Sequence, residues 1–476
     1  MTIPPDSADA STSYDQVAYP STVFPATLPD HLAMVARLHG LSAPPVATAR
    51  VLEIAGGDGV NLIAMAAAYP QASFLSFDLS AVAVARGQAL VAAAGLANVR
   101  IEVGDILTAA AELDGSFDYV IAHGVYAWVP APVRQAIMTL IGRVLAPEGI
   151  AFISYNALPG GYLRQAVRDM LLHNVGHIVD PALRVNAARA LLAHFAEPRA
   201  ADRPVLAAMR EVARPMLRKT AGTLYHDELS SEYWPMSLSD LVADAVVAGL
   251  AFLNDANAAM IEDGFPGDNR DETTVVALAQ ASDYANVVFF RQTLLIRNGR
   301  KPLRARKPSA LASLYIASRW RLSGPETFRA AEGEFTVGDL VLADRLEALA
   351  QIWPFRQPLA TVADTLDRRD AVYRLFERDL LTLHSGPLPG VREPGEQPLA
   401  SPVVRGQIAL GMANLFTLDQ RVTEMAADGP RAFLSLLDGS RDRATLAADW
   451  AATPYGGEID PKAALQQLAA AALISR

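Results

Sequence analysis

The sequence has 476 residues, of which 51% are hydrophobic and 19% charged, so two or three globular domains with hydrophobic cores are expected. It contains no cysteine, which excludes disulfides, thiolate metal sites and a cysteine nucleophile. The net charge of −10 argues against a general affinity for polyanions, so no nucleic-acid partner is expected.

The first 40 residues are predicted to form an N-terminal strap or lid. They begin with the acidic, polar stretch MTIPPDSADASTSYDQ, which lacks the basic and apolar regions of a signal peptide. No apolar run in the sequence reaches the roughly 18 residues that a membrane span needs, so no membrane insertion is expected. A cytoplasmic location is the simplest expectation.

Five short β-rich runs alternate with alanine-rich helical stretches over the next hundred residues. The runs are ARVLEI (49–54), SFLSF (73–77), VRIEV (99–103), DYVIA (118–122) and IAFISY (150–155). This alternation predicts βαβ units and hence an α/β fold, a Rossmann-like, doubly wound, mostly parallel sheet. Ligands of such sheets bind at the carboxyl ends of the strands.

The strand pattern stops after about residue 160, and residues 166–235 are predicted to form a helical insertion. Two further strand candidates, at 250–254 and 286–297, then complete the sheet. The predicted core therefore comprises residues 41–165 and 236–300. A basic stretch with two prolines, 298–309, is interpreted as a linker.

Residues 310–476 are predicted to form a separate, mainly helical region, divided by the Pro- and Gly-rich stretch 385–402. If this region is winged-helix-like, DNA binding is a tempting inference. However, residues 301–476 contain 21 Lys and Arg residues and 21 Asp and Glu residues, so they lack the expected basic face. A scaffold or partner-binding role is favoured.

The turn after the first strand, VLEIAGGDGVNL (51–62), predicts the cofactor. Neither the dinucleotide G-x-G-x-x-G pattern nor a P-loop fits it, because Leu62 replaces the third glycine and no Gly-Lys-Ser/Thr follows. Asp58 would repel a pyrophosphate. The loop suits S-adenosylmethionine, whose sulfonium and α-ammonium groups Glu53 and Asp58 are positioned to meet, while Gly57 and Gly59 allow close backbone approach.

Polar residues at the ends of the next two strands support this cofactor. Asp78, followed by Leu79, closes the second strand, where a carboxylate can bind both ribose hydroxyls. Asp105 and Ile106 follow the third strand, where adenine would lie. Each acid alone is explained equally well as a helix N-cap, but their coincidence at successive strand ends favours binding.

These motifs resemble those of the class I S-adenosylmethionine-dependent methyltransferases. The family pattern has glycine where Ala55 stands. Members that methylate quinone precursors have a similar Ala-Gly-Gly-x-Gly turn, so the departure is expected to be tolerated. The Ala55 methyl group is expected to tighten the space near the methionine moiety.

A narrower resemblance covers nearly the whole chain. It rests on the segments YDQVAYPS (14–21), HGVYAWVP (123–130), SYNALPG (154–160), LYHDELSSEYWPMSLSDLV (224–242), FRQTLL (290–295) and FLSLLDGSRDRATL (433–446). These are similar to bacterial methyltransferases that carry a methyltransferase regulatory domain and a winged-helix-type tail. The best-known relatives are the rickettsial outer-membrane-protein lysine methyltransferases. The resemblance implies this architecture.

The aromatic and amide residues after the fourth and fifth strands are candidates for the methyl-acceptor site. The residues proposed to orient the acceptor and take its proton are His123, Tyr126, Tyr155 and Asn156. His123 is also placed beside the cofactor. Trp128 is assigned to the pocket floor, although Tyr126 and Trp128 are equally suited to covering the core.

Two tyrosines and two histidines have weaker roles. Tyr14 and Tyr19 are candidates for a lid over the cofactor, or for a strap packed on the sheet edge. His173 and His177 have a spacing that can bind zinc, but Asn174 stands where metalloproteases have glutamate and no third ligand is evident. No metal site is expected.

The favoured function is methyl transfer to an amine, above all to a protein or peptide lysine. One alternative is a methyltransferase for a small molecule or a biosynthetic peptide. Another is a non-catalytic S-adenosylmethionine-binding regulator. The acceptor-site aromatics favour the two enzymatic functions, and the sequence predicts no particular oligomeric state.

Overall fold

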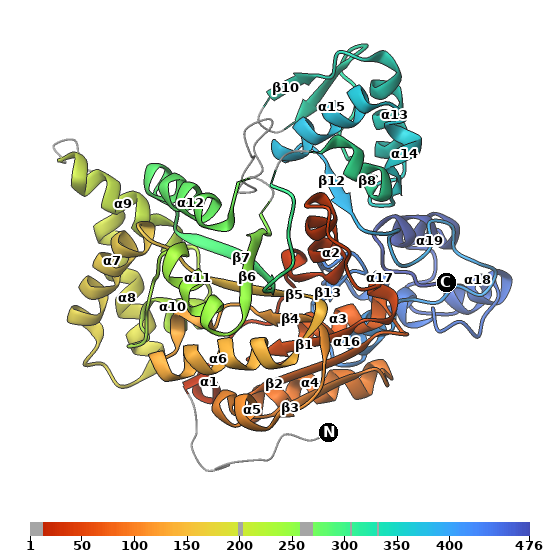
Figure 1. Ribbon diagram of the computed structural model, residues 1–476. Helices are drawn as coiled ribbons and strands as arrows, with labels where there is room; N and C mark the ends of the chain where they lie inside the picture. The colour runs from red at the N-terminus through yellow and green to blue at the C-terminus, as the bar shows by residue number, and fades with distance from the viewer. Residues whose placement is uncertain (1–12, 199–202, 258–269, 305–306, 331–332) are drawn as a thin grey trace.

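The computed structural model describes residues 13–198, 203–257, 270–304, 307–330 and 333–476, and is built around a seven-stranded sheet (Figure 1). The strands are β1 (Arg50–Ile54), β2 (Ser73–Asp78), β3 (Val99–Val103), β4 (Phe117–Ala122), β5 (Leu145–Asn156), β6 (Leu250–Asp255) and β7 (Phe290–Arg297). Their order is β3-β2-β1-β4-β5-β7-β6, and only β7 runs antiparallel to its neighbours. The predicted Rossmann-like sheet is confirmed.

Helices cover both faces of the sheet, because successive side chains of each strand point to opposite faces. Val51 of β1 joins one core with α2 (Pro29–Leu38), α3 (Val60–Ala68) and α4 (Ala81–Ala94). Leu52 joins the other with α5 (Ile106–Glu112), α6 (Ala131–Val144) and α11 (Leu238–Val247). Helix α12 (Glu272–Asn286) packs with α11 over β6.

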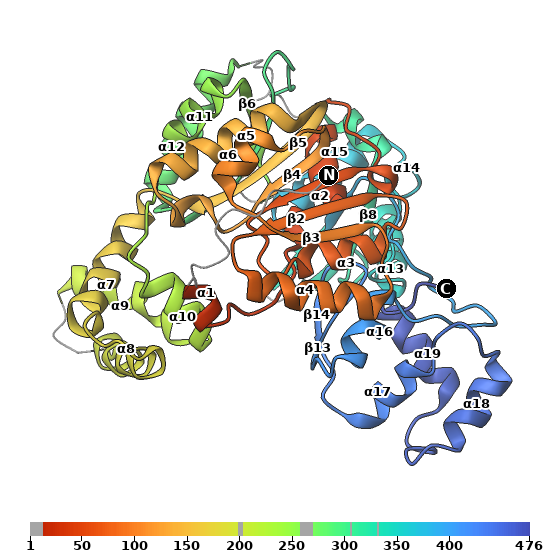
Figure 2. The same ribbon diagram turned by 90° about the horizontal axis from the view of Figure 1, so that it is seen from below.

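A bundle of four helices follows β5; it begins at Gly160, before the expected insertion 166–235, and its last helix ends at Glu228. Its helices are α7 (Gly160–Val175), α8 (Pro181–Ala196), α9 (Pro204–Leu217) and α10 (Ala221–Glu228). They share a small core of their own, which includes Leu171, Leu192 and Leu224. Figures 1 and 2 both show this bundle on the opposite side of the sheet from the C-terminal region.

The C-terminal region is mainly helical with short strands. Its first part contains η5 (Pro308–Ser313), β8 (Tyr315–Ala317), β9 (Thr327–Ala330), β10 (Gly333–Thr336), α13 (Leu340–Gln351), β11 (Gln357–Pro358), α14 (Leu359–Val362), α15 (Leu366–Glu377) and β12 (Thr382–His384). The second contains α16 (Pro402–Ala409), β13 (Asn414–Phe416), β14 (Val422–Glu424), α17 (Asp428–Ser435), α18 (Arg443–Ala451) and α19 (Pro461–Ala470). Its winged-helix character stays a prediction.

Two close contacts attach this region to α2 and α4, which cover one face of the sheet. Asp30 of α2 pairs with Arg356 at 2.9 Å and accepts a hydrogen bond from the Ser385 hydroxyl at 2.8 Å, and all three side chains are buried. Helix α16 lies directly on α4, since a Cβ at Gly406 would come within 2.8 Å of the Ala94 nitrogen. In the described segments, every helix is too short or too polar to span a bilayer.

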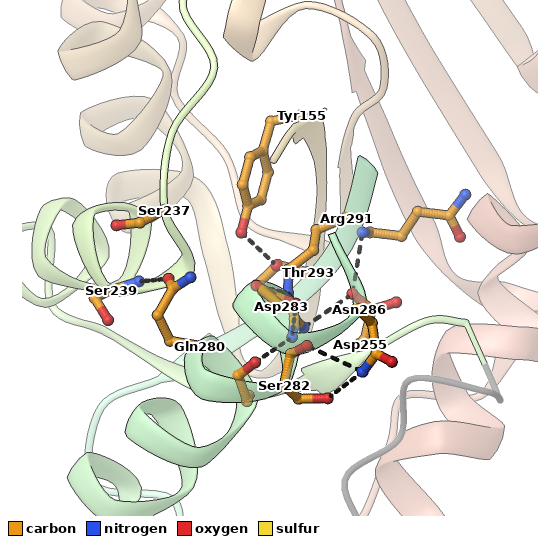
Figure 3. Close-up of polar contacts among 12 residues, drawn as sticks. Tyr155, Ser237, Ser239, Asp255, Gln280, Ser282, Asp283, Asn286, Arg291 and Thr293 are labelled. Atoms are coloured by element: carbon orange, nitrogen blue, oxygen red, sulfur yellow. Dashed lines mark hydrogen bonds and ion pairs between the residues drawn. The ribbon is translucent and has the colours of Figure 1, made fainter. Parts of the chain in front are cut away.

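A buried ionic network joins β6, β7 and α12 (Figure 3). Arg291, only 1% exposed, donates from Nε to Asp283 at 2.8 Å and from Nη1 to Asp255 at 3.4 Å. Burial raises the pKa of Asp255 to about 6, and the Arg291 charge opposes that rise. The guanidinium therefore holds two buried carboxylates in one site.

Replacing Arg291 by methionine is expected to destabilise the protein by about 3–5 kcal/mol, because two buried carboxylates lose their counter-charge. Denaturant unfolding followed by circular dichroism measures the change. The matched control is Arg329→Met, since Arg329 makes an exposed pair with Glu334 and should contribute less than about 1 kcal/mol. An Arg291→Met midpoint equal to that of the control would contradict the prediction.

Candidate cofactor and acceptor site

The loop between β1 and α3 has an unusual backbone. Ala55, Gly57 and Gly59 have φ values of 55°, 60° and 67°, in the left-handed region that glycine adopts most readily. A side chain at Gly57 would meet no atom within 4 Å, so the loop faces open space there. For Ala55 this conformation costs roughly 1–2 kcal/mol.

Gly56, which the sequence analysis did not single out, rests directly on the strands. A Cβ there would lie 2.2 Å from the Ser76 hydroxyl and 2.8 Å from Glu53 Oε2. Glu53 is therefore behind the loop, 3% exposed, and burial raises its pKa to about 8. Its Oε1 accepts from Asn61 at 2.8 Å, whereas Oε2 and the Ser76 hydroxyl are buried without a partner in the described structure.

Asp78 ties this loop to the end of β2. Its two oxygens accept hydrogen bonds from the backbone nitrogens of Gly57 and Ser80, both at 2.9 Å. The N-cap of α4 is Ser80, whose hydroxyl accepts from the Ala83 nitrogen. The capping explanation considered for Asp78 therefore does not account for this residue, and the neighbouring Leu79 is 55% exposed.

Asp105 does cap a helix. Its Oδ1 accepts from the backbone nitrogens of Leu107 and Thr108 at 2.7 and 3.2 Å, at the start of α5. Ile106, the first residue of α5, packs partly buried against the sheet core. Both residues lie at the same sheet edge as Asp78, because β2 and β3 are parallel. Their contact with adenine stays a prediction.

The chain before α2 is hydrogen-bonded to the glycine loop. Ser21 donates to Asp58, which is 9% exposed, and the Phe24 nitrogen donates to Asn61 Oδ1 at 3.0 Å. Asn61 also donates to the Thr27 hydroxyl at 3.0 Å. Sequence reasoning missed Asn61, although a lone amide in the otherwise apolar helix VNLIAMAAA was a usable signal.

Helix α10 of the insertion holds the same N-terminal segment from the other side. Tyr14 of α1 (Ser13–Gln16) stacks on His226, with ring centres 4.0 Å apart, and His226 donates to the Val17 carbonyl at 2.6 Å. Tyr19 donates to Asp227 at 3.3 Å. Burial, with the nearby carboxylates of Asp227 and Asp78, raises the pKa of Tyr14 to about 12.

His123 follows β4 and faces the N-terminal segment. Its ring lies 3.9 Å from that of Phe24, and its Nδ1 is 2.9 Å from the Ser154 hydroxyl. The rings of Phe152 and Phe290 complete an apolar surround at 5.8 and 6.4 Å. Burial lowers the pKa of His123 to about 4, so the imidazole is neutral at neutral pH.

The two candidate tyrosines lie on the opposite face of the sheet from His123, in the core with α5, α6 and α11. Tyr126, in the turn η3 (Tyr126–Trp128), donates to Asp244 at 3.1 Å. Tyr155 accepts from Thr293 at 3.4 Å (Figure 3). Both side chains are almost completely buried. The structure thus does not bring their hydroxyls together with His123.

Asn156 and Trp128 are held by the junction between the sheet and the insertion. Asn156 is buried at the end of β5, where its backbone carbonyl accepts a hydrogen bond from the Met236 backbone nitrogen at 3.0 Å. The Trp128 ring lies 5.2 Å from that of Tyr233, and the guanidinium groups of Arg164 and Arg168 each lie 5.3 Å from it. Cation–π contacts therefore anchor α7 to this turn.

His173 lies in the last turn of α7, and His177 follows the helix. No group of three or more potential metal ligands from His, Cys, Asp and Glu occurs among the described residues.

The residues at this edge fit S-adenosylmethionine. A Cβ added at Gly57 or at Gly124 would meet no other atom within 4 Å. The backbone is therefore accessible after β1 and after β4. Asp58 and Asp78 bring negative charge to this edge, and Glu53 holds an unpartnered carboxyl oxygen behind the loop. That charge suits a cationic ligand and opposes a phosphate.

Known proteins are similar to this chain in sequence and in fold. Residues 51–149 match the model of the family described as "Methyltransferase domain". Two uncharacterized proteins of Rickettsia prowazekii (strain Madrid E) are related: RP789 is 33% identical over 60% of this chain, and RP028 is 41% identical over 34%. The chain spans 53% and 64% of the lengths of these relatives.

The structure of PKMT2 from Rickettsia typhi is similar over 96% of this chain and 100% of its own, with a TM-score of 0.80 and 23% identity. Its complex with AdoHcy gives a TM-score of 0.79 at 22% identity. This likeness extends the shared fold beyond the matched domain. The chain therefore contains a class I S-adenosylmethionine-dependent methyltransferase domain and resembles the rickettsial proteins of this fold.

Proposed function

We propose that the whole protein transfers a methyl group from S-adenosylmethionine to an amine, and that this amine belongs to a protein or peptide lysine. The observation that carries the proposal is the apolar surround of His123, formed by Phe24, Phe152 and Phe290. The burial that lowers the pKa of His123 to about 4 would also lower that of an arriving lysine. A neutral amine is the nucleophile that methyl transfer requires.

When bound, S-adenosylmethionine supplies an electrophilic methyl group on a positively charged sulfur. In this proposal the turn 55–59 approaches the methionine part through its backbone, and Asp78 binds the ribose hydroxyls. Asp58 compensates the positive charge. Glu53 contributes through its unpartnered carboxyl oxygen behind the turn, since burial raises its pKa to about 8 and so favours the neutral carboxyl group. Asp105, Leu79 and Ile106 border the adenine.

On the acceptor side, His123 and Asn156 orient the substrate beside the methyl group. Holding the nucleophile about 3–3.5 Å from the methyl carbon and in line can supply most of the catalysis. Tyr126 and Tyr155 support the floor from the core below, since their hydroxyls are engaged by Asp244 and Thr293.

Tyr14 and Tyr19 form the proposed lid. The lid includes the chain that hydrogen-bonds Asp58, and its tyrosines contact α10 of the insertion. The resemblance to lysine methyltransferases and the length of the protein beyond the matched domain support a polypeptide acceptor. The insertion and C-terminal region would then border a groove for it.

Incubation with methyl-labelled S-adenosylmethionine and a bacterial lysate tests the proposal. Label in protein bands that hydrolysis releases as methyllysine is the expected result. Label confined to the small-molecule fraction would contradict the polypeptide acceptor. Cofactor binding with no transfer to purified lysine-rich proteins or to lysate would contradict enzymatic activity and favour a regulator.

Replacing Asp78 by alanine is expected to weaken S-adenosylmethionine binding by roughly 1–3 kcal/mol, because hydrogen bonds to the ribose are lost. The loss should be at the upper end, since Asp78 also holds the Gly57 nitrogen. Calorimetric titration measures it. Asp114→Ala is the control, because Asp114 is 77% exposed and lies before β4, at the opposite edge. Equal affinities for the two variants would remove Asp78 from the site.

Replacing Ala55 by glycine is expected to leave cofactor affinity unchanged or slightly higher, because glycine adopts the φ of 55° without strain. Relief of that strain stabilises the folded protein, whereas glycine gives the unfolded chain more conformational freedom and so destabilises the fold. Because the two effects oppose each other, the free energy of unfolding should change by less than about 1 kcal/mol. Titration and thermal unfolding of the same preparation check both expectations. A tenfold loss of affinity would show that the Ala55 methyl group itself contacts the cofactor.

A further inference from the structure

A buried serine contacts the ring of His123 from below. Ser154 lies in β5 with no exposed surface, and its Oγ accepts a hydrogen bond from the Gly124 nitrogen at 2.8 Å. The same Oγ lies 2.9 Å from His123 Nδ1. Gly124 has a φ of 68°, and this left-handed turn directs its N–H back toward the strand.

The hydroxyl proton of Ser154 has one destination. A serine hydroxyl has one proton to donate, and burial makes an unpaired donor costly. Among the described residues, the acceptor found within hydrogen-bond distance of this hydroxyl is His123 Nδ1. Since Gly124 already donates to Ser154, the pair is fully satisfied when Ser154 donates to Nδ1.

We propose that Ser154 is a positioning residue that fixes His123 as the neutral tautomer with its proton on Nε2. His123 then presents an N–H donor to the acceptor site, and its basic nitrogen is occupied by Ser154. A polypeptide offers a backbone carbonyl as the matching acceptor, so His123 orients the substrate chain beside the reactive lysine. The role in binding substrate rests on the proposed function.

The surroundings of the ring favour the neutral form. The rings packed against His123 are phenyl groups, Phe24 from the N-terminal segment, Phe152 from β5 and Phe290 from β7. Among the described residues, burial lowers the pKa of His123 by removing water from the ring, and no charged neighbour contributes to this shift. A neutral imidazole has one donor and one acceptor, and its tautomer follows from its hydrogen-bond partner.

Nitrogen NMR of the full chain labelled with ¹⁵N-histidine tests the tautomer without requiring activity. The protein has eight histidines, so a His123→Gln variant assigns the signal. We expect a protonated Nε2 and an unprotonated Nδ1 at pH 7. In Ser154→Ala the neutral form loses the hydrogen bond that stabilises it, so both tautomers should be populated and the His123 pKa should rise. Ser154→Thr, which keeps the hydroxyl, should retain the wild-type signal.

A protonated Nδ1 in the wild type overturns the proposal, as does an unchanged tautomer and pKa in Ser154→Ala. If the alanine variant fails to fold, the spectra of the wild type and of Ser154→Thr still show which ring nitrogen of His123 carries the proton. Where methyl transfer is measurable, Ser154→Ala should raise KM for the acceptor about three- to tenfold and leave kcat nearly unchanged. A fall in kcat at unchanged KM would make His123 the base and contradict the inference. Absence of methyl transfer would refute the proposed function and leave the NMR result to judge the tautomer.

Discussion

The rest of the site depends on how the turn after β1 is held against the strand ends. Gly56 has no side chain, and this allows the turn to lie directly on Glu53 and Ser76. Asp78 then fixes the turn from the neighbouring strand through the Gly57 nitrogen. These contacts require a parallel β1–β2 pair in register, because only then do the two strand ends meet at one edge. The sheet thereby places an open, negatively charged edge where a cationic adenosyl ligand fits.

Buried polar contacts join the separate parts of the chain to this edge. Asn61 and Asp58 accept hydrogen bonds from the N-terminal segment. From α10 of the insertion, His226 donates a hydrogen bond to the same segment. On the other side, the buried pair of Asp30 and Arg356 attaches the C-terminal region to α2. Buried charges of this kind tolerate little displacement, since separating them leaves an uncompensated charge in the interior. The N-terminal segment is thus the shared element between the cofactor loop and the insertion.

Neutral groups dominate the proposed acceptor side. His123 is surrounded by phenyl rings, and Tyr126 and Tyr155 are in the core with their hydroxyls engaged. An environment that disfavours charge suits the transfer of a methyl group to a neutral amine, since the ammonium form has no lone pair. A lysine whose pKa is lowered by desolvation needs no strong base to lose its proton. This requirement is compatible with the proposed role of His123 as a hydrogen-bond donor.

The sequence by itself determined the sheet, its strands and the cofactor edge. Short β-rich runs separated by helical stretches specify a parallel sheet, and such a sheet brings residues 53–59, 78 and 105 to one edge whatever the details of packing. Only the tertiary structure decided how the residues of the proposed acceptor side are arranged. Strand alternation sends Tyr155 to one face and Ser154 to the other. The positions of α11 and the N-terminal segment decide what covers each face at this point. Those positions arise from contacts between residues far apart in the sequence, which no local pattern contains. Ser154 and His123 are 31 residues apart, and Val17 and His226 are 209 residues apart.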